Sequence, residues 1–72
     1  MAETHGQKIR GLRRAAKISL TDLSARVDKG ASYISRCETG KNPMPVALYY
    51  KLRSEIYELA RERAEAALTV DE

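Results

Sequence analysis

Hydrophobic positions recur at helical spacing through most of the chain, which predicts an all-α fold. A first helix is expected to begin after Thr4, because Gln7, three residues further on, completes a capping box. It should run to about Ala16. Ile9, Leu12 and Ala16 then share the face that we expect to be buried.

Residues 19–40 have the pattern of two short helices joined by a tight turn. Ser19 is the expected N-cap of the first of them, and the carboxylate of Asp22 is expected to reach back to free backbone N–H groups. Leu23 and Val27 share the inner face of this helix. The turn is expected at residues 28–30, where Gly30 tolerates a positive φ and can also cap the helix that follows.

The second helix of the pair divides into two faces. Ile34 and Cys37 supply the inward face, to which Tyr33 can add. The other side carries small and polar residues at helical spacing, namely Ala31, Ser32, Ser35 and Arg36. This arrangement predicts a helix-turn-helix.

A loop rich in proline and glycine follows at residues 40–45, and Pro45 suits the first turn of another helix. Because no glycine or proline occurs from Pro45 to about Leu68, we expect one long helix. At about 1.5 Å per residue it would reach ~36 Å, which is longer than a small bundle can cover. The alternative is a fifth helix that folds back at Ser54.

Apolar positions on this last helix alternate at spacings of three and four, as in a coiled coil. The positions are Tyr49, Leu52, Ile56, Leu59, Arg63, Ala66 and Val70, and the charge of Arg63 weakens the series. We expect a second copy of the chain to pair here, with dimer contacts at Leu52, Ile56 and Leu59. The alternative is that the same positions face the protein's own core.

The charge of the chain is divided unevenly. Seventy-two residues make a single domain, in which residues 1–44 form a helix-turn-helix head and residues 45–72 the C-terminal helix. The head holds nine lysines and arginines against four acidic residues, a net charge of +5, whereas residues 45–72 carry −2. A basic head attracts a phosphate backbone, and an acidic helix is compatible with protein contact or solvent.

Several function classes are not expected. No run approaches the ~20 apolar residues that span a bilayer, and the first residues lack a signal-peptide core, so we expect a cytoplasmic protein without membrane contact. Cys37 has no second cysteine for a disulfide, and His5 has no companions for a metal site. Because catalytic and phosphate-binding motifs are missing, we expect no enzyme activity, no cofactor and no small-molecule ligand.

Residues 33–41, with the sequence YISRCETGK, resemble the lambda-repressor and Cro family of XRE-like helix-turn-helix proteins. The resemblance extends over about residues 6–56. It implies a bundle of four or five helices whose second helix-turn-helix element enters the major groove of DNA. Departures from the family pattern occur at Leu20, where a phosphate-binding glutamine is usual, in the turn at Asp28 and Lys29, and at Gly30 and Ala31, where fewer base contacts are implied.

Arg36 is the leading candidate for base contact, since its planar guanidinium matches O6 and N7 of guanine. A phosphate contact, or an ion pair with Glu38 or Asp22, is the alternative. Base contacts are expected at Ala31, Ser32, Ser35 and Arg36, and DNA backbone contacts at Ser19, Tyr33, Lys41 and Asn42. The resemblance gives Glu38 a structural role, with Arg10 or Arg13 as its partner.

The sequence therefore predicts a transcriptional regulator that binds a palindromic operator in double-stranded DNA as a homodimer. Phage Cro-like repressors, restriction-modification controllers and antitoxins all fit, as does the N-terminal domain of a longer repressor. The alternative is an adaptor protein whose acidic C-terminal helix binds another protein while DNA binding is weak or lost.

Overall fold

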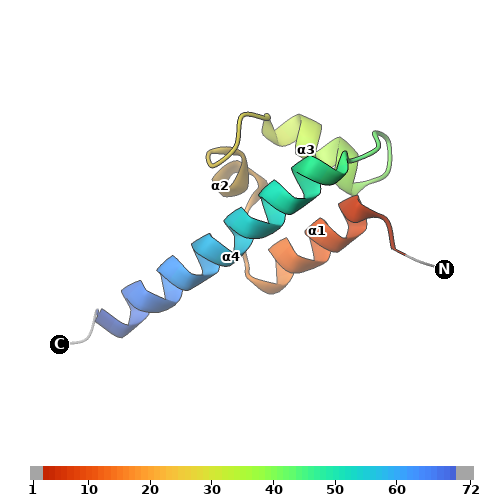
Figure 1. The fold of residues 1–72 in the computed structure, drawn as a ribbon. Helices are drawn as coiled ribbons and strands as arrows, with labels where there is room; N and C mark the ends of the chain where they lie inside the picture. The colour runs from red at the N-terminus through yellow and green to blue at the C-terminus, as the bar shows by residue number, and fades with distance from the viewer. Residues whose placement is uncertain (1–2, 70–72) are drawn as a thin grey trace.

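The computed structural model describes residues 3–69, and in this range it contains helices and no strand (Figure 1). The helices are α1 (His5–Ala15), α2 (Leu20–Ser24), α3 (Ala31–Glu38) and α4 (Val46–Thr69). The all-α prediction is confirmed, and so is the single long C-terminal helix. No break occurs at Ser54.

The starts of the first three helices follow the sequence closely. The Thr4 hydroxyl accepts the N–H of Gln7 at 3.1 Å, and the side chain of Gln7 accepts the N–H of Thr4 at 3.0 Å, so the capping box is confirmed. Ser19 caps α2 by accepting the N–H of Asp22 at 3.0 Å. The role expected for the Asp22 carboxylate is wrong, because it binds Arg63 instead. Gly30 does precede α3 as its N-cap, but with φ −72°.

Positive φ angles occur at the ends of α1 and α3 and not at Gly30, where one was expected. Lys17 has φ 59° and Gly40 has φ 86°. In both places the next N–H turns back to a carbonyl of the last helical turn, from Ile18 to Arg13 at 3.0 Å and from Lys41 to Arg36 at 2.9 Å. This is the Schellman ending, which satisfies carbonyl groups that the helix itself leaves free.

The core receives side chains from all four helices and from the connections between them. Its buried members are Ile9, Ile18, Leu23, Ile34, Cys37, Met44, Leu52, Ile56 and Leu59. Leu52, Ile56 and Leu59 are only 0%, 1% and 8% exposed. The expectation that these three residues form a dimer contact is therefore corrected: they face the core of their own protomer.

Two features of the packing determine the shape of the molecule. Helices α1 and α3 approach so closely at Gly6 that a Cβ there would lie 1.9 Å from the carbonyl oxygen of Cys37. The C-terminal part of α4 extends past the bundle, and the longest dimension of the molecule is 46 Å (Figure 1). Val70, the last position of the expected coiled-coil series, lies outside the described residues.

No helix within residues 3–69 combines the length and the apolar character that crossing a membrane requires.

Candidate nucleic-acid interface

The outward face of α3 carries the four residues expected to contact bases. Ser32 and Arg36 are exposed, whereas Ala31 and Ser35 are half-buried beside them. The opposite face of α3 is buried, through Ile34, Cys37 and Glu38. The helix is thus fixed on one side and open on the other, as a helix that enters a groove of DNA must be.

Arg36 makes no ion pair with any carboxylate of residues 3–69. Both of the acidic partners considered for it are already engaged: Glu38 binds Arg13, and Asp22 binds Arg63. The guanidinium of Arg36 keeps all its N–H donors available on the exposed side of α3.

Glu38 holds α3 against α1. Nε and Nη2 of Arg13 donate to the two carboxylate oxygens of Glu38, each at 2.9 Å, and Nη1 of Arg13 donates to the carbonyl of Ile18 at 3.0 Å. This hydrogen bonding raises the pKa of Arg13, and partial burial opposes the rise. Of the two partners expected for Glu38, the structure confirms Arg13.

The residues expected at the DNA backbone lie around the ends of α2 and α3. The hydroxyl oxygen of Ser19 accepts the N–H of Asp22 in the cap of α2, and the residue is exposed. A hydroxyl that accepts one hydrogen bond can still donate another. Lys41 is exposed and Asn42 half-buried in the loop after α3. Tyr33 is half-buried, with Nζ of Lys29 5.4 Å from its ring centre. Its pKa is raised, first by hydrogen bonding with Cys37 and then by desolvation.

Basic side chains in the described part of the head outnumber the acids that could neutralise them. Two of its acids are used in ion pairs with Arg13 and Arg63. Seven cations there make no ion pair with any residue in 3–69: Lys8, Arg10, Arg14, Lys17, Lys29, Arg36 and Lys41. These charges favour a polyanion.

A comparison with protein families matches residues 6–54 to a family described as a helix-turn-helix domain, and this is an XRE/Cro-like family. The match covers more than half of the chain. The chain belongs to this helix-turn-helix family. The family binds DNA and is typically non-enzymatic. No curated protein and no solved structure matches the chain.

The contacts between α4 and the first half of the helix-turn-helix were not predicted from the sequence. Arg63 donates to Asp22 at 2.6 Å and to the carbonyl of Lys17 at 3.0 Å. Arg26 pairs with Glu62 and, at 3.5 Å, with Glu55. Arg63 shares the inner face of α4 with buried leucines, and that position could have indicated a partner within the bundle.

Leu20 also has a structural use. It packs against the hydrophobic core as the first residue of α2. An apolar side chain held there makes no phosphate contact, so the helix-turn-helix must bind DNA without the hydrogen bond that a glutamine at this position supplies.

Proposed function

We propose that the protein is a transcriptional regulator that binds a palindromic operator in double-stranded DNA as a homodimer. The observation that carries this proposal is Arg36 on the open face of α3, which, like the basic side chains around it, makes no ion pair within residues 3–69. The buried face of the same helix is anchored by Glu38, so α3 can be presented to DNA without rearrangement.

In this mechanism α3 lies in the major groove. The guanidinium of Arg36 donates to O6 and N7 of a guanine, and the hydroxyls of Ser32 and Ser35 donate to neighbouring base edges or phosphates. The methyl group of Ala31 contacts a thymine methyl. Backbone contacts hold the protein in register at Ser19, Tyr33, Lys41 and Asn42.

A homodimer carries two such helices related by a two-fold axis. It therefore binds two half-sites about one helical turn apart. Regulation is steric: the dimer at a promoter excludes the polymerase, or recruits it where the site lies upstream. Control comes from protein concentration, with no cofactor and no small-molecule ligand in the mechanism.

Two variants in and beside α3 test this assignment, after footprinting of the adjacent intergenic DNA has located the operator. Arg36→Ala should weaken operator binding by ~1–3 kcal/mol per half-site and change binding to random DNA little. Lys41→Ala should weaken binding to both DNAs by similar factors. Both variants should unfold at the wild-type temperature, since neither side chain makes an ion pair within residues 3–69. Equal losses on both DNAs for Arg36→Ala would contradict its role as a base contact.

The salt dependence of binding distinguishes this function from that of an adaptor protein. The adaptor alternative is supported by Leu20, which packs against the core at a position where the family usually has a phosphate-binding glutamine. The logarithm of operator affinity should fall with the logarithm of salt concentration, with a slope of about −0.9 for each phosphate contact. Lys41→Ala should make the slope shallower by roughly one unit per site. A flat response, or no gel shift with the promoter DNA, would favour the adaptor.

A further inference from the structure

The outer face of α4, opposite the core, carries large hydrophobic side chains in contact with solvent. The exposed fractions are 54% for Val46, 58% for Tyr50, 51% for Tyr57 and 80% for Leu68. The inner face of the same helix is already covered by the bundle. Within residues 3–69 this outer face remains exposed, and it could be covered by a partner.

The outer face also has the spacing of a coiled coil. Its exposed residues follow one another at intervals of 4, 3, 4, 3 and 4, and we call them the outer seam: Tyr50, Ser54, Tyr57, Arg61, Ala64 and Leu68. Alternation of three and four keeps a row of side chains facing a second helix along its whole length. The seam runs for most of α4, so its occupant should be another long helix.

We propose that the outer seam binds the outer seam of a second copy, with the two α4 helices antiparallel and the pairing centred at residue 59. This inference rests on the homodimer of the proposed function and gives it an interface. Tyr50 then packs on the partner's Leu68, Ser54 faces the partner's Ala64, and Tyr57 faces the partner's Arg61. Each contact occurs twice, as a two-fold axis requires.

Charge favours the antiparallel direction. Lys51, which pairs with Glu55 in its own chain, comes next to the partner's Glu65, and this contact also occurs twice. The same offset brings Glu58 beside the partner's Glu58, where each carboxylate is neutralised by Arg61 of its own chain. A parallel pair would instead place Arg61 against its own copy. In the antiparallel pair Arg61 meets a tyrosine ring, and the same ring already takes the guanidinium of Arg53 within its own chain, 5.3 Å from its centre.

The exposed hydrophobic side chains select the register. A shift by one heptad in one direction places Leu68 opposite Pro43, which precedes α4, and leaves Leu68 uncovered. The same shift in the other direction places Tyr50 opposite a position past Thr69, where α4 ends. Only centring at residue 59 covers both Tyr50 and Leu68 within the helices.

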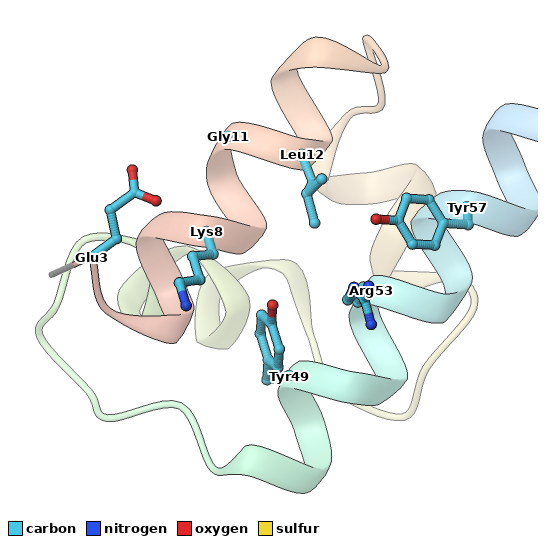
Figure 2. A pocket seen from close by; sticks show the side chains of 7 residues that line it. All are labelled: Glu3, Lys8, Gly11, Leu12, Tyr49, Arg53 and Tyr57. Atoms are coloured by element: carbon cyan, nitrogen blue, oxygen red, sulfur yellow. The ribbon is translucent and has the colours of Figure 1, made fainter.

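A groove beside the seam could receive side chains of the second helix. It has a volume of about 390 Å³ and lies between α1 and α4, with Leu12 directed into it and with Tyr49, Arg53 and Tyr57 along its α4 side (Figure 2). In the proposed pairing Arg53 lies beside the partner's Ala67, which is small enough for the two helices to approach closely.

A cysteine pair tests direction and register together. In Ser54→Cys/Ala64→Cys the two thiols lie about 15 Å apart along one helix, whereas a disulfide needs Cα atoms within ~7 Å, so a 54–64 bond must join two copies. Oxidation of the full chain without DNA should give covalent dimers, with 54–64 links in the peptide map. Each single variant is the control and should remain monomeric on a non-reducing gel. Links of 54 to 54, or no 54–64 link, would overturn the proposal.

A charge placed in the seam tests the interface by another route. Tyr50→Glu should weaken dimerisation roughly tenfold or more in sedimentation, because it puts a carboxylate against the partner's Leu68 at each end of the contact. Gln7→Glu is the matched control, since a carboxylate there can keep the capping box of α1. An unchanged dimer in Tyr50→Glu would overturn the interface.

Random-sequence DNA separates this inference from the proposed function. Monomeric Tyr50→Glu should keep salt-dependent binding to a short random duplex, because its head is unaltered. Dimers linked 54–64 that bind no DNA would refute the DNA-binding function and leave the interface standing. A wild-type chain that stays monomeric in sedimentation while still binding DNA would refute the interface and the homodimer, and would leave the DNA-binding function standing.

Discussion

Two contacts hold the helix-turn-helix in place, and they are built in opposite ways. Helix α3 is held by α1 through a backbone approach at Gly6 and through the Arg13–Glu38 pair, whose side chains are 14% and 3% exposed. Helix α2 is tied to α4 at the surface through the ion pair of Arg63 with Asp22, whose side chains are 44% and 47% exposed.

The two contacts differ in how firmly each holds its helix in position. A buried bidentate pair and a contact at backbone distance leave α3 a single position relative to α1. Exposed ion pairs contribute little energy and are screened by salt, so they fix α2 less firmly. The polar contacts therefore hold α3 more firmly than α2, whose main anchor is the buried Leu23 with Leu20 packed beside the core.

Gly6→Ala should give the largest effect. The added Cβ would meet the carbonyl oxygen of Cys37 at 1.9 Å, so α1 and α3 must separate, and the free energy of unfolding should fall by about 3 kcal/mol or more. Urea denaturation measures it. Gly11→Ala in the same helix is the control: its Cβ meets nothing within 4 Å, and it should stabilise the protein by about 0.5–1 kcal/mol. Similar results for the two variants would show that α1 and α3 are not in close contact.

Glu38→Ala should give the next largest effect. It leaves the largely buried guanidinium of Arg13 without its two charged hydrogen bonds and should lower the free energy of unfolding by about 2–3 kcal/mol. Glu58→Ala is the control, because it removes a bidentate pair with Arg61 on the exposed surface of α4 and should change stability little. Equal losses in the two variants would contradict the distinction between buried and exposed contacts.

Local signals were enough to predict most of the fold. Thr4 with Gln7, Ser19 and Pro45 indicate where helices begin, and the absence of glycine and proline after Pro45 indicates one long helix. These signals act over three or four residues. The open face of α3 at Ser32 and Arg36 follows in the same way from helical spacing.

Contacts between distant residues could not be predicted so well. The repeat through Leu52, Ile56 and Leu59 is the same for a core and for a dimer, and only the packing of α1 and α2 shows that these residues are buried within one protomer. The partners of Asp22 depend on where Arg63, 41 residues away, is carried by α4. Nothing in the sequence near residue 6 indicates that glycine is required there, because the requirement comes from the close approach of α3.

Arg63→Gln should give the smallest effect and shows how the α2–α4 contact behaves. The variant removes the exposed positive charge that pairs with Asp22, and it should lower the free energy of unfolding by no more than about 0.5 kcal/mol at low salt. Salt of ~0.5 M should remove most of that cost, because screening already weakens the wild-type pair.

Glu38→Ala, measured at the same two salt concentrations, is the reference for a contact shielded from solvent. Its loss should persist at high salt, since the ions that screen Arg63 and Asp22 cannot reach a pair this deeply buried. A loss in Arg63→Gln as large as that in Glu38→Ala, at both salt concentrations, would mean that the exposed pair between α2 and α4 is as strong as the buried pair between α1 and α3. The contrast between an exposed and a buried contact would then be wrong for this protein.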